Sequence, residues 1–190
     1  MRLQPLILSV RESGRTRSDA AQSSCPFCGV RFAEGQEPFL CPDGTNDFPC
    51  APCHLVRHLE RDTIAEEALL IWLPEMTQSA LNALALGAHR RLARDGALDR
   101  AASPFALSPD EVPNGALEAI RALEARSFEA ETRLGASSPR VLGAALMRMK
   151  PRLYEDRARL LGGIRLWPRG RFFVDGEDIY PQLIADRVAA

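Results

Sequence analysis

Two Cys-x-x-Cys pairs, Cys25/Cys28 and Cys50/Cys53, constrain the fold of this chain more than any other feature of its sequence. Each pair can direct two sulfur atoms toward one metal ion from a tight turn. Four thiolates complete the tetrahedral coordination that zinc adopts in structural sites, and the spacing of the two pairs is close to the pattern typical of such sites. The sequence therefore predicts one structural zinc ion, with Cys25, Cys28, Cys50 and Cys53 as its ligands.

Two alternative roles for these cysteines compete with the zinc site. Disulfide bonds are one, but Met1–Val10 has only a short apolar run and no small-residue cleavage site of a secretory signal, so we expect a reducing compartment. Chance clustering of core residues is weaker still, since all five cysteines fall between Cys25 and Cys53. The fifth thiol, Cys41, and the imidazole of His54, which follows Cys53, remain alternative ligands for one of the four positions.

Composition places the chain among ordinary globular proteins. It has 190 residues, of which 46% are hydrophobic and 26% are charged, and these values fit one domain. We expect an N-terminal strand and zinc-knuckle lobe over residues 1–66, and a strand with a helical lobe packed on it over residues 67–190, together forming one compact unit. The net charge of −1 provides no basic field for nucleic acid, and no apolar run approaches the ~20 residues that cross a bilayer.

Periodicity and turn residues predict an α+β fold that is mostly helical after the metal lobe. Strands are predicted at Leu3–Val10 and Ala68–Leu73, with a small hairpin in the metal lobe (Val30–Phe32 and Pro38–Leu40) and a short late hairpin (Ile164–Pro168 and Arg171–Val174) around Arg169-Gly170. Helices are predicted from near His54 and at about Gln78–Arg94, Gly115–Leu134, Arg140–Met149, Arg152–Leu161 and Glu177–Val188. Trp72 is predicted to lie in the core, and Trp167 near the late hairpin's tip.

Asp43-Gly44 lies between the two cysteine pairs, and His54 follows the second pair directly. This layout resembles the HNH nuclease family, in which a Cys-x-x-Cys pair precedes a β-hairpin and C-x-x-C-H opens a helix. Leu40-Cys41 stand where that family has two histidines. Nuclease chemistry needs a general base and a hard divalent cation, which neither leucine nor a lone cysteine supplies. We therefore expect a degenerate, structural HNH-like ββα unit and no enzymatic activity.

Two alternative functions stay open. One is an HNH-derived, metal-dependent nuclease that uses His54, His58 and Asp43, because the two histidines lie on one face of a helix. The simpler interpretation is that one of these histidines lies on the helix surface and the other packs inside. The second alternative is a zinc-dependent nucleic-acid-binding protein, whose affinity for DNA would fall steeply with salt.

Further segments with a recognisable pattern are spread over nearly the whole chain. They are Leu3–Arg11, the C-P-F-C-G knuckle, Leu70–Gln78 with Leu81-Asn82, Leu134–Met147, and Gly163–Pro168 with Tyr180-Pro181. In these segments the chain resembles the DotN/IcmJ family of type IVB (Dot/Icm-type) secretion and conjugation systems. The I-W-L-P-E-x-x-Q block within Leu70–Gln78 and the knuckles are the more specific parts of this resemblance.

What the resemblance implies is an accessory subunit and not a catalyst. Members of the family carry an HNH-like zinc unit with a structural role and belong to the cytoplasmic coupling complex. For this chain it implies an adaptor that binds the C-terminal extension of the coupling ATPase, contacts other coupling-complex subunits and helps to recruit substrates. It also implies a location at the inner face of the bacterial inner membrane, with no small-molecule substrate and only indirect contact with the membrane.

Overall fold

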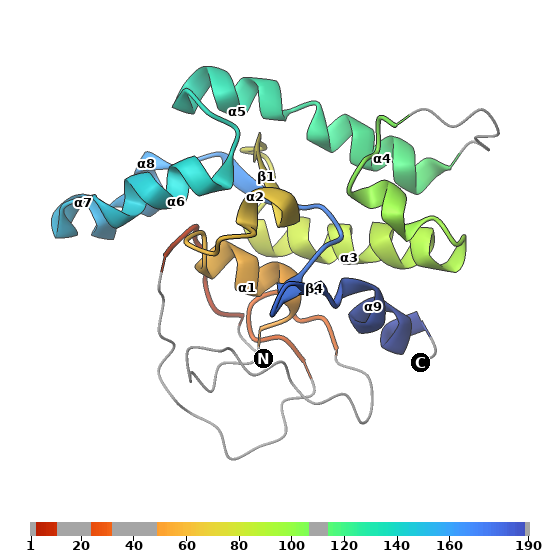
Figure 1. The fold of residues 1–190 in the computed structure, drawn as a ribbon. Helices are drawn as coiled ribbons and strands as arrows, with labels where there is room; N and C mark the ends of the chain where they lie inside the picture. Colours follow the sequence, from red (N-terminus) through yellow and green to blue (C-terminus); the bar gives the residue numbers. More distant parts are fainter. Residues whose placement is uncertain (1–2, 11–23, 32–48, 107–113, 189–190) are drawn as a thin grey trace, which may run out of the picture.

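The computed structural model describes residues 3–10, 24–31, 49–106 and 114–188 (Figure 1). Over these ranges the chain is an α+β fold, as its sequence predicts. The helices are α1 (Ala51–Arg57), α2 (Ile64–Glu67), α3 (Gln78–Arg94), the 3-10 helix η1 (Leu98–Ala101), α4 (Gly115–Glu124), α5 (Ser127–Leu134), α6 (Pro139–Met147), α7 (Pro151–Glu155), α8 (Arg157–Leu160) and α9 (Tyr180–Val188). The strands are β1 (Ala68–Trp72), β2 (Ile164–Pro168), β3 (Phe173–Val174) and β4 (Glu177–Asp178).

A two-stranded antiparallel sheet of β1 and β2 joins the two halves of the core, with Leu70 opposite Leu166. Successive side chains of a strand point to opposite faces. Leu70 and Leu166 accordingly enter one cluster of buried apolar side chains, and their neighbours Ile71 and Trp167 enter a second cluster. In Figure 1, α5 lies above β1 and α4 to its right, while α1 and α3 lie below it. The strand predicted in this apolar run is therefore confirmed, with both of its faces covered.

The single helix predicted over Gly115–Leu134 is wrong, because the segment is broken into α4 and α5 near Arg126. The break supplies backbone acceptors to the edge of β1 that pairs with no strand among the described residues. There the amide of Trp72 donates to the Arg126 carbonyl oxygen at 3.2 Å, and the amide of Leu70 donates to the Ser137 carbonyl oxygen at 2.9 Å. A buried backbone N–H without a partner is costly, so pairing with the sheet outweighs the continuous apolar stripe of the sequence.

The helix predicted over Gln78–Arg94 is confirmed with the same bounds as α3. The Thr77 side-chain oxygen accepts from the Ala80 amide at 3.2 Å, as expected of a capping residue, and Gly96, with a φ of 68°, follows its end. The helix predicted over Arg152–Leu161 is instead interrupted at Asp156, between α7 and α8.

No helix in the described ranges combines the length and the apolar character that a bilayer span requires.

The late hairpin is formed by other strands than predicted. β2 pairs with β1 and not with the segment after Arg169-Gly170, whereas β3 pairs with β4. The turn between β3 and β4 is Asp175-Gly176, whose φ angles of 51° and 85° suit a tight hairpin turn. Asp178 Oδ1 then accepts from the Tyr180 amide at 3.1 Å, and for this reason α9 begins later than predicted.

The strand predicted at Leu3–Val10 is also wrong, because residues 3–10 form no strand. The segment bonds instead to the end of a helix. The Ser9 amide donates to the Val56 carbonyl oxygen at 3.0 Å, and the Leu59 amide donates to the Ser9 carbonyl oxygen at 3.1 Å. The first described residues are thus held against the C-terminal end of α1.

Neither tryptophan has the environment predicted for it. Trp167 is fully buried instead of lying at a hairpin tip. Trp72 is only half-buried, and the Arg133 guanidinium lies 3.8 Å from its ring centroid in a cation–π contact. Gly163, with a φ of 87°, packs so closely against the Trp72 ring that a Cβ there would overlap it.

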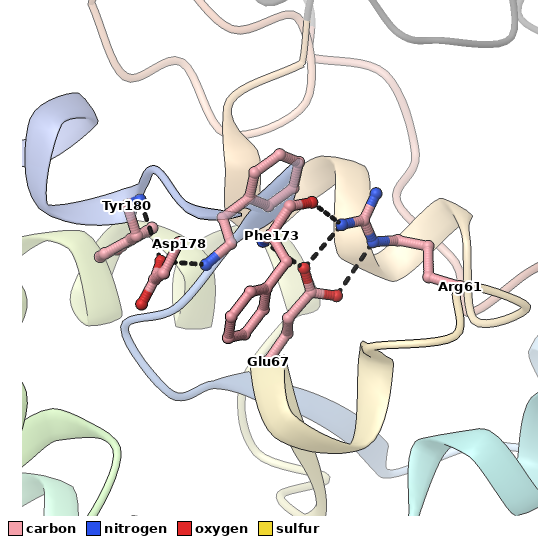
Figure 2. A network of polar contacts seen from close by, with 6 residues as sticks. Arg61, Glu67, Phe173, Asp178 and Tyr180 are labelled. Carbon is pink, nitrogen blue, oxygen red and sulfur yellow. Dashed lines mark hydrogen bonds and ion pairs between the residues drawn. The ribbon is translucent and has the colours of Figure 1, made fainter. Parts of the chain in front are cut away.

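A buried ion pair connects the front of the chain to the late hairpin (Figure 2). The Glu67 carboxylate is completely buried and accepts from the Arg61 guanidinium at 2.6 and 2.9 Å and from the Phe173 amide at 2.8 Å. Arg61 also donates to the Phe173 carbonyl oxygen at 2.7 Å. Because each buried polar group has its partners, the network fixes β3 relative to α2 and the turn before it.

Candidate metal centre

The first Cys-x-x-Cys pair lies on a tight turn between Ser24 and Arg31, which form an isolated β-bridge. The Cys25 amide donates to the Val30 carbonyl oxygen at 2.8 Å, and the Gly29 amide donates to the Cys25 carbonyl oxygen at 2.9 Å. Gly29 has a φ of 73°, which residues with a Cβ rarely adopt. These bonds fold the chain back on itself around the first two sulfurs.

The second pair is placed by the start of α1. Cys50 immediately precedes the helix, and Pro52 lies within its first turn, where proline's missing N–H is not needed. The His54 amide closes that turn on the Cys50 carbonyl oxygen at 3.0 Å. The helix therefore begins at Ala51, earlier than the predicted start near His54, and Cys53 belongs to its first turn.

The four cysteine sulfurs converge from these two turns. The Sγ atoms of Cys25, Cys28, Cys50 and Cys53 all lie within 4.8 Å of one another, and those of Cys28 and Cys50 are 3.5 Å apart. All four thiols are free of disulfide bonds. Tetrahedral bonds of about 2.3 Å from a zinc ion would separate the sulfurs by about 3.8 Å, so the observed cluster fits such an ion. The prediction that these side chains come together is confirmed, and the cluster can hold a metal ion.

Burial and proximity make the four thiols unequal acids. Hydrogen bonds with Cys28 and Cys50 hold the pKa of Cys25 well below its ordinary value. Burial raises the pKa of Cys53 well above its ordinary value, and the hydrogen bond with Cys25 does the same to the pKa of Cys50. Four thiolates this close repel one another strongly in a low-dielectric interior. A cation bound at their centre would offset this repulsion. Metal binding therefore favours the deprotonated form of the thiols.

Asn82, on α3, was not predicted as part of the site, yet it contacts the cluster directly. Its Nδ2 donates to Cys53 Sγ at 3.3 Å, while its Oδ1 accepts from Gln78 Nε2 at 2.9 Å. Gln78 is fixed in turn by the Leu166 backbone, donating to its oxygen at 2.8 Å and accepting from its amide at 2.9 Å. A relay of amides thus leads from β2 to the Cys53 sulfur. The sequence signal was a pair of polar residues, four apart, on the buried face of a helix.

A backbone donor also reaches the cluster. The Cys50 amide donates to Cys25 Sγ at 3.4 Å. Together with the Asn82 amide, it directs partial positive charge at two of the sulfurs. Hydrogen bonds to ligating atoms orient metal ligands and stabilise their charged form.

His54 and His58 are both buried, so the prediction that one lies on the helix surface is wrong. Their rings stack with centroids 4.3 Å apart, and Phe172 packs edge-on against His54 at 5.5 Å. His58 Nδ1 lies 2.9 Å from a Glu60 carboxylate oxygen. Burial lowers the pKa of His54 to about 2, which keeps its imidazole neutral. Among the described residues, no group of three or more potential metal ligands includes either histidine.

Several predicted features of this lobe lie outside the described residues. They are Cys41, Asp43-Gly44, the strand Pro38–Leu40 and the end of the strand Val30–Phe32. The alternative of Cys41 as a ligand therefore stays a prediction.

Comparison with known proteins adds no family to this geometry. No protein-family model matches the chain, and no curated protein matches it significantly. The function has to be inferred from the site and from the sequence.

Proposed function

We propose that this chain is a non-catalytic adaptor built on a degenerate HNH-like lobe, in which four thiolates hold one structural zinc ion. In this role it binds the C-terminal extension of the coupling ATPase of a type IVB secretion or conjugation system, on the cytoplasmic side of the inner membrane. One observation carries the zinc part of the proposal: the sulfurs of Cys25, Cys28, Cys50 and Cys53 all lie within 4.8 Å of one another. The role at the coupling ATPase is proposed from the resemblance of the sequence to the DotN/IcmJ family.

The number and kind of ligands support a structural ion. Catalytic zinc sites keep one position open for water or substrate, whereas structural sites are closed by four protein ligands. Here four sulfurs converge, and Cys25, Cys50 and Cys53 are buried. Zinc bound by this set would crosslink the first turn to α1, and the chain's own contribution is to hold the sulfurs in place.

The position of the cluster supports an effect on the whole fold. Cys25, Cys50 and Cys53 belong to the same cluster of buried side chains as Leu8 near the start of the chain and Tyr180 near its end. The free energy of metal binding contributes directly to folding where the site forms only in the native state. An adaptor needs a surface of fixed shape, and a metal in the core supplies that rigidity.

The segment with the most specific resemblance supports the same role. Leu70–Gln78 with Leu81-Asn82 spans much of β1 and the start of α3. It contains both amides of the relay that ends on the Cys53 sulfur. These residues therefore have a structural reason to occur together with the knuckles.

A nuclease function has less support from the same geometry. A general base must reach the water that it activates. His54 is buried, its pKa is lowered to about 2 by that burial, and Phe172 packs against it. These features suit a side chain that supports the helix more than one that receives a proton from water.

A calorimetric titration tests the adaptor proposal. Zinc-loaded, full-length protein is titrated with the purified C-terminal extension of the coupling ATPase from the same genome, under reducing conditions. We expect saturable binding, with loss of binding after the metal is removed by a chelator. Failure of well-folded, zinc-loaded protein to bind would contradict the proposal. Metal-dependent nicking of plasmid DNA that disappears in His54→Ala would contradict its non-catalytic part.

A further inference from the structure

The junction between α6 and α7 carries exposed basic and apolar side chains on a short segment, Met147–Leu153, called the tip below. Figure 1 shows α6 and α7 extending away from the rest of the described fold, with α8 returning toward it. Met147 is 42% exposed and Leu153 is 50% exposed. Arg148, Lys150 and Arg152 are exposed as well. The tip therefore presents apolar and cationic groups side by side along the sequence.

The basic side chains of the tip have no partner in the part of the chain that the structure describes. Within those ranges, the side chains of Arg148, Lys150 and Arg152 have neither an ion pair nor a hydrogen bond. By contrast, Arg159 on α8 forms an ion pair with Asp156. Residues 139–161 carry six basic and two acidic side chains, although the whole chain has a net charge of −1. Positive charge is thus concentrated on this arm and available at its tip.

Met147 and Leu153 of the tip are exposed, whereas Met149 is partly buried and packs against the core. Neither α7 nor α8 contains a buried residue. α6 is anchored in the core by Leu142 and Leu146, whereas α7 is held by Tyr154, whose Oη accepts from the Val10 amide and donates to the Val10 carbonyl oxygen, both at 3.1 Å. Leu153 is accordingly exposed without a packing role. Exposed apolar groups that gather in one place mark interaction sites.

A recess of about 440 Å³ lies next to the tip, between α6 and the turn at residues 59–62, and Met147 and Arg148 line its edge. Gly143 lets α6 approach this turn closely, because a Cβ there would overlap the carbonyl oxygen of Leu59. A recess of this size falls in the range of pockets that enclose small apolar groups. It can receive an apolar side chain while the cations of the tip remain free.

We propose that the tip binds an acidic segment of a partner protein. The segment inserts an apolar side chain into the recess and places its carboxylates on Arg148, Lys150 and Arg152. Guanidinium groups form strong, charge-assisted hydrogen bonds with carboxylates, and the neighbouring apolar groups supply the buried area that charge pairs on an exposed surface lack.

The geometry favours an acidic protein segment over an anionic membrane or a nucleic acid as the partner. Basic segments that bind anionic membranes carry roughly four to eight clustered basic residues, whereas the tip has three, Arg148, Lys150 and Arg152. In addition, α7, with 5 residues, is too short to present an amphipathic face to a bilayer. A nucleic-acid backbone would meet Glu60 and Asp62, which line the opposite wall of the recess. An acidic peptide can avoid these carboxylates by placing an apolar group between them and the cations.

Fluorescence anisotropy tests this inference with a labelled peptide of glutamate and leucine, its leucines at helical spacing. The full, zinc-loaded chain should bind this peptide, and more salt should weaken the binding. Arg148→Glu/Arg152→Glu should weaken it at least tenfold. Arg91→Glu/Arg94→Glu, an equal charge change at the exposed end of α3, should leave it nearly unchanged. Leu153→Ser should weaken binding more than Leu84→Ser, another exposed leucine.

Three results would overturn the inference. One is no binding of the acidic peptide by folded protein. Another is an equal loss in the tip and α3 variants. The third is stronger binding to phosphatidylglycerol vesicles or to duplex DNA that depends on the same tip residues. The inference does not depend on the coupling-complex proposal: a chain that binds the acidic peptide but not the ATPase extension would refute only that proposal.

Discussion

Replacing Asn82 by alanine should weaken zinc binding, and comparison with a variant that affects only stability shows whether the effect is specific to the metal cluster. The substitution removes the amide that donates to Cys53 Sγ at 3.3 Å. Gln78 loses one acceptor but keeps its two bonds to the Leu166 backbone. The change therefore acts mainly on the sulfur, which must carry negative charge to bind a metal.

The magnitude follows from the kind of bond that is lost. A hydrogen bond to a charged group contributes about 1.5–3 kcal/mol, and loss of an outer partner of a metal ligand typically lowers metal affinity by about 10- to 100-fold. We expect Asn82→Ala to weaken zinc binding within that range. Asn82→Asp, of nearly the same size, should weaken it further, because a carboxylate repels the thiolate and donates no hydrogen bond.

Zinc affinity is measured by competition with a chromophoric chelator, beside urea unfolding with and without metal. Asn114→Ala is the matched control: its side chain caps α4 through Ala116 and Leu117, so it should cost about 1 kcal/mol of stability without changing zinc affinity. Unchanged zinc affinity in Asn82→Ala, or an equal loss in Asn114→Ala, would refute the reasoning.

Three further predictions concern the fold. Glu67→Gln should lower the free energy of unfolding, measured by urea denaturation, by about 3 kcal/mol, because it leaves the Arg61 guanidinium without a buried counter-charge. A loss under about 1 kcal/mol would contradict this. Burial lowers the pKa of His89 from 6.5 to about 3. The unfolded chain therefore binds the proton first, and His89 contributes a loss of stability of ~1.4 kcal/mol for each pH unit below about 6.5, to which buried His54 adds in the same direction. His89→Phe should reduce this slope without abolishing it, and an unchanged slope would refute the assignment. Gly143→Ala should lower the melting temperature, because the added Cβ overlaps the Leu59 carbonyl oxygen. Gly87→Ala meets no atom within 4 Å and should raise the melting temperature, stabilising α3 by up to about 1 kcal/mol.

The cysteine cluster could be predicted because its information is local in sequence. Each Cys-x-x-Cys pair needs only one turn, and the chemistry of four thiolates selects the ion. The role of Asn82 could not be predicted in the same way, because it depends on α3 packing beside α1. Gln78 and Asn82 mark a polar pair on the buried face of a helix, but this pattern does not identify the Cys53 sulfur as the partner of Asn82.

The errors in the fold have the same origin. The segment Gly115–Leu134 has the apolar stripe of one helix, but the carbonyl oxygen of Arg126 is needed by the edge of β1. The pairing of β1 with β2 joins residues far apart in the chain, so no local pattern announces it. Asp175-Gly176 is itself a hairpin signal that the sequence carries, whereas the hairpin predicted around Arg169-Gly170 is wrong. Local turn chemistry and apolar runs could be predicted, but long-range pairing could not.

X-ray absorption at the zinc edge, on full-length protein purified without added metal, tests most directly whether the four thiolates hold one ion. Elemental analysis should give one zinc per chain, and the spectrum should show four sulfur neighbours at about 2.3 Å. A nitrogen neighbour would indicate that His54 replaces a thiolate. Protein that is folded and active in partner binding but contains no metal would contradict the account.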